Sequence, residues 1–114
     1  MSDCIFCKIV SGEIKTEFVD EMIDAVLIKD KNPLAPHHVL AISKEHASSG
    51  CEMRTSDAIL DMYAMLCAYA YKNGLDKTGY RILTNSGKDA GQTVNHFHMH
   101  LLGGAELKND FGAK

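Results

Sequence analysis

Six histidines lie in two short windows of the chain, and their spacing indicates a chemical role. His96, His98 and His100 alternate with apolar residues. In a strand, alternate side chains share one face about 6.6 to 6.8 Å apart, so these imidazoles would form one row while the residues between them face the core. Three imidazoles in register suit a metal ion or a reaction better than they suit solvation. The other histidines are His37, His38 and His46.

The segment before this row carries groups that can hold an anion. Residues 85–93 read Asn-Ser-Gly-Lys-Asp-Ala-Gly-Gln-Thr. Its glycines let the backbone approach a ligand closely, and its amide and hydroxyl groups donate hydrogen bonds. A protein that only binds metal stays the alternative, because alternate histidines on a strand are also ordinary ligand spacing and His37 or His38 could complete such a site. The loop favours phosphate chemistry over metal capture.

A second candidate group is the Cys4-Ile5-Phe6-Cys7 segment near the amino terminus. Such a cysteine pair can be redox-active, can pack as ordinary side chains, or can hold zinc together with two further ligands. A redox role is disfavoured because no strand of the thioredoxin kind precedes the pair. The chain has only four cysteines, so we expect no disulfide scaffold, and a reducing compartment would keep them as thiols.

The composition indicates one ordinary globular domain over residues 1–114, with 46% hydrophobic and 24% charged residues. A formal net charge of -3 argues against general affinity for nucleic acid, because binding to the phosphate backbone needs a basic surface. No apolar run approaches the roughly 20 residues of a membrane span, and the first residues do not resemble a secretory signal. We therefore expect a cytoplasmic protein that binds neither nucleic acid nor membrane.

Hydrophobic periodicity predicts the elements that position these groups. Apolar residues recur at helical spacing over residues 56–73 and predict one long helix. Met62, Met65 and Tyr69 make its other side apolar too, which predicts burial against a second chain. The fold class is α+β: a largely antiparallel sheet with this helix and a short helix or turn over residues 5–14. Strands are expected over residues 18–24, 25–29, 38–43, 80–85 and 95–102.

The segment His96-Phe97-His98-Met99-His100-Leu101-Leu102 resembles the His-φ-His-φ-His-φ-φ signature of the histidine triad (HIT) superfamily, whose members transfer or hydrolyse nucleotides at the α-phosphate. The closing Gly103-Gly104 resembles the Hint branch of nucleoside phosphoramidases more than the Fhit branch of dinucleoside polyphosphate hydrolases. The resemblance implies a HIT-like fold whose sheet continues across a homodimer. Further matching segments, in order, are Cys4 to Ile9, Asp30 with Asn32-Pro33, His38 to Leu40, Tyr80 to Asn85 and Gly91 to Thr93.

The resemblance also implies a reaction and a set of site residues. His98 would attack the α-phosphate of a purine nucleoside phosphoramidate, of the AMP-NH2 or AMP-lysine type, and form a nucleotidyl-histidine that water then hydrolyses. His100, Thr93 and His38 would complete the catalytic set, and no organic cofactor is implied. The residues expected to bind the nucleotide are Ile5, Phe6, Ile28, Asp30, Lys31, Asn85, Gly91, Gln92, Thr93, His98 and His100.

Bacterial-type members of the superfamily resemble this chain in their cysteine pair as well. That resemblance implies a structural zinc ion, with Cys4, Cys7, His46 and His96 as ligands. His96 would then serve structure, while the two later histidines of the row serve chemistry. His37 has no role in this pattern and is expected to be a solvated side chain.

Some residues depart from the Hint pattern and leave alternatives open. Thr93 stands where that branch usually has serine, and Ile28 and Lys31 replace common aromatic and aliphatic residues of the base pocket, so base preference stays open. Within enzymes, the alternative is asymmetric hydrolysis of dinucleoside polyphosphates. A second alternative is a nucleotide-binding interaction module with vestigial activity.

Overall fold

The computed structural model describes residues 3–108. Among them, five antiparallel strands form one sheet in the order β1-β2-β3-β5-β4. This sheet, with one long and one short helix, confirms the predicted α+β class. The strands are β1 (Asp20–Glu21), β2 (Ala25–Lys29), β3 (His37–Ser43), β4 (Tyr80–Leu83) and β5 (His98–Gly103). The helices are α1 (Ile5–Ser11), α2 (Asp57–Lys72) and α3 (Leu75–Thr78), and the 3-10 turns are η1 (Gly50–Glu52) and η2 (Lys88–Ala90).

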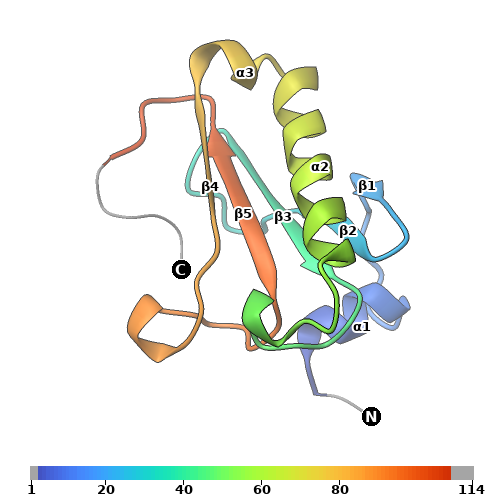
Figure 1. Ribbon diagram of the computed structural model, residues 1–114. Helices are drawn as coiled ribbons and strands as arrows, with labels where there is room; N and C mark the ends of the chain where they lie inside the picture. The colour runs from blue at the N-terminus through green and yellow to red at the C-terminus, as the bar shows by residue number, and fades with distance from the viewer. Residues whose placement is uncertain (1–2, 109–114) are drawn as a thin grey trace.

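A helix covers each face of this sheet, and the strand alternation explains why. Leu27 of β2 belongs to the apolar cluster that packs under α2, whereas its neighbours Val26 and Ile28 belong to the cluster that packs against α1. Because successive side chains of a strand point to opposite faces, a strand buried on both sides reads as a continuous apolar run. Figure 1 shows the long α2 lying along the sheet and the short α1 beside its lower edge.

The long helix matches its predicted range, and Leu66 and Ala70 of its predicted apolar face are buried, but its core face also includes residues expected on the other side. Met62 and Met65, expected on the outer side, are 0% and 1% exposed and pack on the sheet. Tyr63, by contrast, is 51% exposed. The reason is that the helix is apolar on both sides, so periodicity alone does not decide which side meets the sheet. The unbranched methionine side chains fill the irregular space above β3 and β5.

Several element boundaries differ from the predicted ones. The short helix predicted over residues 5–14 ends at Ser11, and the strand predicted over residues 18–24 is only Asp20–Glu21. The final strand begins at His98 rather than at residue 95, because the His96 N–H bonds the Val94 carbonyl in a tight turn (2.8 Å). The strand predicted over residues 80–85 ends at Leu83. Helix α3 was not predicted, since four residues are too few to show a helical period. Within the described part of the chain, no helix has the length and apolar character needed to cross a bilayer.

Candidate active site and metal centre

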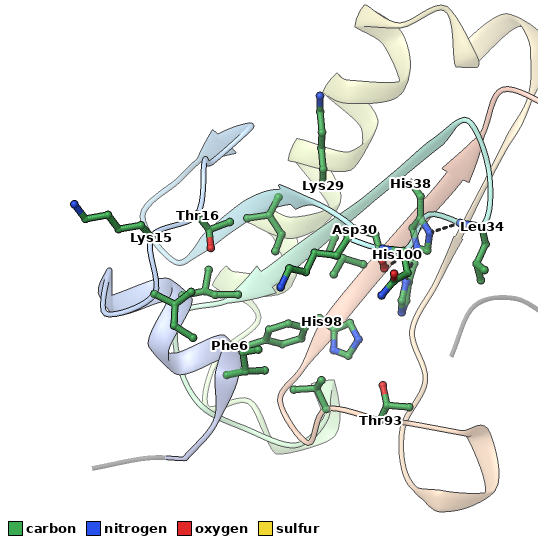
Figure 2. A pocket seen from close by; sticks show the side chains of 18 residues that line it. Phe6, Lys15, Thr16, Lys29, Asp30, Leu34, His38, Thr93, His98 and His100 are labelled. Carbon is green, nitrogen blue, oxygen red and sulfur yellow. Dashed lines mark hydrogen bonds and ion pairs between the residues drawn. The ribbon is translucent and has the colours of Figure 1, made fainter.

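A cavity of about 670 Å³ opens between α1 and the face of the sheet that α1 covers. One end is apolar and is lined by Ile5, Phe6 and Ile9 of α1 together with Ile28 of β2. At the other end the lining includes two histidines of the row, and Figure 2 shows them beside Thr93. A largely apolar cleft with a few polar groups gathered at one end is the usual form of a small-molecule site.

His98 lines this cavity, and its hydrogen bonds define which ring nitrogen carries the hydrogen. Its Nδ1 is 2.7 Å from the carbonyl oxygen of His96, and a carbonyl can only accept, so Nδ1 carries the hydrogen. Nε2 therefore carries a lone pair. Burial lowers the pKa of His98, which keeps the ring neutral near pH 7. The ring of Phe6 packs edge-on against it, with 4.9 Å between ring centroids. A neutral imidazole held in this way is suited to nucleophilic attack.

His100 is oriented by a chain of hydrogen bonds that begins at a backbone amide. The Leu34 N–H donates to Nδ1 of His38 (3.1 Å), so the hydrogen of His38 is on Nε2. That Nε2–H donates to Nδ1 of His100 (3.0 Å), which places the hydrogen of His100 on its own Nε2. This Nε2 is buried and has no hydrogen-bond partner among the described residues. The chain of contacts therefore leaves one N–H available for an acceptor in the cavity.

The surroundings of His38 and His100 favour the uncharged form of both rings. Burial, together with the neighbouring His98 and His38, lowers the pKa of His100 to about 4. The pKa of His38 is also lowered by burial, against the opposite effect of Asp30, whose Oδ2 is 3.4 Å from Nε2 of His38. At neutral pH both rings are therefore uncharged. The uncharged His100 can donate its Nε2–H to a phosphate oxygen, and no positive charge has to be buried in the cavity before the substrate binds.

Four side chains meet at the amino-terminal end of α1: Cys4, Cys7, His46 and His96. Nε2 of His96 is 2.7 Å from the Ser43 carbonyl and carries the hydrogen, so Nδ1 presents a lone pair. This Nδ1 is 3.2 Å from the Cys4 sulfur, 3.5 Å from the Cys7 sulfur and 3.1 Å from Nδ1 of His46. The cluster could hold a metal ion such as zinc.

The spacing of these atoms fits a tetrahedral ion. Bonds of about 2.3 Å to sulfur and about 2.0 to 2.1 Å to nitrogen place two ligand nitrogens about 3.4 Å apart, and a nitrogen and a sulfur about 3.5 Å apart. The Cys7 sulfur is 3.2 Å from Nδ1 of His46, close to that value. The Cys4 sulfur also accepts the Cys7 N–H at the start of α1, which fixes the position of this ligand relative to the helix. All four predicted ligands thus come together.

A second group of possible ligands is occupied by its own hydrogen bonds. Asp30, His38 and His100 bring one ligand atom each within 4.8 Å of the others. However, Nδ1 of His38 already accepts the Leu34 N–H, and Nδ1 of His100 accepts the Nε2–H of His38. Metal binding would require these hydrogens to move. This group is better described as a hydrogen-bonded relay than as a metal centre.

Several predicted nucleotide-binding residues line the cavity, and others do not. Lys31 and Asp30 line it, and Asp30 also accepts the Asn32 N–H (2.8 Å), so its carboxylate holds the turn as well as facing the cavity. Three predicted residues lie outside the lining: Asn85, Gly91 and Gln92. The Gln92 side chain instead shapes the loop, because it donates to the carbonyls of residues 48 and 94 and accepts the N–H of residue 87.

Sequence reasoning missed some lining residues and misplaced one histidine. Ile14, Lys15 and Thr16 line the apolar end, but they follow a glycine turn and show no pattern that would reveal this. His37, expected in solvent, is half-buried, and its Nδ1 is 2.7 Å from the Tyr69 hydroxyl. That prediction was wrong because His37 alternates with His38 along β3 and so faces α2.

Comparison with known proteins agrees with this geometry. The model of the HIT domain family matches residues 11–107. The chain belongs to the HIT family. A HIT family hydrolase from Legionella pneumophila is 35% identical, with a TM-score of 0.87 over 96% of this chain and 100% of that one.

Two further relatives span most of this HIT chain. The histidine triad nucleotide-binding protein from Candida albicans is 30% identical, with a TM-score of 0.80 over 95% of this chain and 87% of that one. Protein HitA from Neisseria gonorrhoeae is 39% identical over 105 residues, which are 90% of this chain and 97% of that protein. The family prediction is thereby confirmed, while the Hint branch stays a prediction.

Proposed function

We propose that this HIT protein is a hydrolase of purine nucleoside phosphoramidates that acts at the α-phosphate through a covalent nucleotidyl-histidine. The observation that carries the proposal is the hydrogen-bonding state of two rings. His98 has a lone pair on Nε2, and His100 has an unpartnered N–H on Nε2, in one cavity. A nucleophile next to a donor for a developing negative charge is what phosphoryl transfer requires.

In the first step, Nε2 of His98 attacks the phosphorus atom and a nitrogen–phosphorus bond forms. The bond from phosphorus to the leaving amine breaks, and the amine takes a proton from water through the Thr93 hydroxyl. The ring gains positive charge as the bond forms, and its Nδ1–H donates to the His96 carbonyl throughout. That carbonyl dipole stabilises the charged ring and prevents it from rotating.

In the second step, water attacks the phosphorus from the side the amine has left. The bond to Nε2 of His98 breaks, the nucleoside monophosphate is released, and a proton passes to solvent. His100 donates its Nε2–H to a phosphoryl oxygen in both steps, because the donor from His38 keeps Nδ1 of His100 occupied. His38 thus acts as a positioning residue rather than as a group that touches the substrate.

The rest of the cavity suits a nucleoside. The apolar end accommodates a base between α1 and β2. Asp30 lines the cavity beside His38, with its Oδ2 3.4 Å from Nε2 of that ring, and its carboxylate can accept hydrogen bonds from ribose hydroxyls. By the resemblance to the Hint branch, Asn85 and the backbone of residues 91–93 would contact the sugar and the phosphate. Zinc at the cysteine and histidine cluster would supply structure, since it would join α1, which forms one wall, to the strand that carries the nucleophile.

The decisive experiment measures hydrolysis of adenosine 5′-phosphoramidate and of a diadenosine polyphosphate by the wild type and by His98→Asn. Asparagine can still donate to the His96 carbonyl but has no nucleophile, so we expect kcat/KM for the phosphoramidate to fall at least about 1,000-fold. In the wild type, a short reaction stopped with denaturant at alkaline pH should leave the nucleotide attached to His98, detectable by mass spectrometry, because the nitrogen–phosphorus bond is cleaved by acid.

His37→Asn is the matched control, because His37 lies on the opposite face of β3 and should leave turnover within about twofold of the wild type. Equal rates for wild type and His98→Asn would contradict a reaction centre at the histidine row. A wild type that cleaves only the polyphosphate would instead support the dinucleoside alternative.

A further inference from the structure

The apolar end of the cavity contains few groups that can recognise the edge of a base. Its walls are isoleucines and a phenylalanine, which offer no hydrogen bonds. Besides the histidines, Lys29, Asp30 and Thr93, the polar side chains that line the cavity are Lys15, Thr16, Lys31 and Asn32. Figure 2 places Thr16 and Lys15 on the far side of Phe6 from Thr93, so they lie where a base would end if its phosphate is held by the histidines.

The positive charges of this cavity are not balanced within it. Lys15, Lys29 and Lys31 line it, while Asp30 is the acid among the described lining residues. The Asp30 carboxylate already accepts the Asn32 N–H and lies 3.4 Å from Nε2 of His38. No hydrogen bond or ion pair among residues 3–108 involves the ammonium group of Lys31.

The three lysines are not equivalent. Lys29 lies on the same face of β2 as Ala25 and Leu27, which pack under α2, and Figure 2 shows its side chain directed along α2, away from Phe6 and His98. Lys15 extends outward from the rim in the same view. Lys31 follows the end of β2, beside Asp30, and lines the cavity. It is therefore the cation best placed to meet a bound nucleoside.

The purines differ in what they offer to such a cation. Guanine and hypoxanthine present a carbonyl oxygen at position 6 next to the acceptor N7, whereas adenine presents an amino group that donates. An ammonium group can only donate, and the Thr16 hydroxyl can do either, so Thr16 does not discriminate between the two. Asn32, which also lines the cavity, can likewise donate or accept, so Lys31 is the side chain that distinguishes the two kinds of purine.

We propose that Lys31 makes this site selective for 6-oxopurine nucleotides, those of guanine or hypoxanthine, over adenine nucleotides. The proposal rests on the proposed function, because that function orients the phosphate toward the histidines and the base toward the apolar end. The natural substrate class would then be phosphoramidates of guanosine or inosine. Lys31 would determine specificity through the base, without touching the reacting phosphorus.

The test is direct binding of the product nucleotides to the wild-type protein, measured by titration calorimetry with IMP, GMP and AMP. IMP differs from AMP only around position 6, so it isolates the group that Lys31 would contact. We expect IMP and GMP to bind about fivefold more tightly than AMP, the size of one exposed charge-assisted contact. Lys31→Met should remove this ratio. Lys29→Met, which removes the same charge two residues away, should retain it.

Each other result overturns the proposal. AMP binding as tightly as IMP in the wild type would show that position 6 is not recognised. GMP binding tightly while IMP resembles AMP would assign selectivity to the 2-amino group instead. A ratio that survives Lys31→Met would exclude Lys31. Hydrolysis of adenosine 5′-phosphoramidate, measured in parallel, distinguishes failure of the base selectivity from failure of the proposed function. Turnover without a preference for IMP refutes only the base selectivity. A lack of both turnover and nucleotide binding refutes the proposed function itself.

Discussion

Each histidine of the row takes its role from the atom that its second ring nitrogen contacts. His96 and His98 both donate to backbone carbonyls, yet through opposite ring nitrogens, so the lone pair of one faces the cysteines and that of the other faces the cavity. The alternation of these residues could be predicted from sequence. Their tautomers could not, because the acceptor for His96 is the carbonyl of Ser43, 53 residues away.

At the residue scale, burial of neutral histidines predicts a loss of stability in mild acid. The pKa of His100 is lowered from 6.5 to about 4, so above about pH 6.5 the ring is neutral in both folded and unfolded chains. As the pH falls from 6.5 toward 4, His100 becomes protonated in the unfolded chain before it does so in the folded one. This difference lowers the unfolding free energy by up to about 3 kcal/mol. Urea unfolding of the wild type at pH 7 and pH 5 measures this loss.

His100→Gln supplies the comparison for that measurement, because glutamine does not titrate. Its unfolding free energy should fall less between pH 7 and pH 5 than that of the wild type, whatever its stability at pH 7. An equal fall in unfolding free energy between pH 7 and pH 5 in the two proteins would contradict the assignment of the acid sensitivity to His100.

At the element scale, α1 and its N-cap residue contribute to both the candidate metal site and the cavity. Cys4 and Cys7 face the metal cluster, while Phe6 and Ile9 face the sheet and line the cavity. The sequence predicted the ligands from the cysteine spacing and the family resemblance. It did not predict that residues 14–16 extend the same wall, because Gly12 turns the chain back at a φ of 86° and no periodicity continues through that turn.

This arrangement predicts that loss of the metal weakens nucleotide binding more than chemistry. Cys7→Ser should lower the zinc content well below one ion per chain, reduce the melting temperature, and raise KM for the phosphoramidate with a smaller change in kcat, since α1 carries part of the base wall but none of the reacting groups. Elemental analysis, thermal melts and steady-state kinetics measure the three effects.

Cys51→Ser is the control for this variant, because Cys51 is exposed and lies outside the metal cluster. It should leave zinc content and KM unchanged. Full zinc occupancy in Cys7→Ser would contradict the four-ligand site.

At the scale of the whole molecule, one side of the protein has the features of an interface. Strand β4 is at one end of the sheet, and the exposed Tyr63 of α2 interacts with Cys67 of the same helix and with Tyr80 of β4. Leu60 of α2 is also 65% exposed. An apolar patch that continues onto the open edge of a strand is suited to pairing with a second copy.

We therefore expect a homodimer at micromolar concentration and a monomer after Tyr63→Glu, both measured by native mass spectrometry. The added charge would have to be buried against its own symmetry mate, which costs several kcal/mol. Ile23→Glu is the control, because Ile23 is 87% exposed near the opposite end of the sheet, between β1 and β2, and it should leave the dimer intact. A monomeric wild type would refute the dimer.

The order of the strands also determines when the protein can assemble during its synthesis. Strand β5 is the last of the described strands to be made, yet it lies between β3 and β4 and carries His98, the proposed nucleophile. Until β5 emerges, β4 has no neighbour among the described strands. Cys4 also lacks its contact with His96, which lies 92 positions later in the chain. Domains with such distant pairings fold as units once the chain is nearly complete. A growing chain would therefore bring together its four candidate metal ligands, its histidine row and its central strand in a single late event.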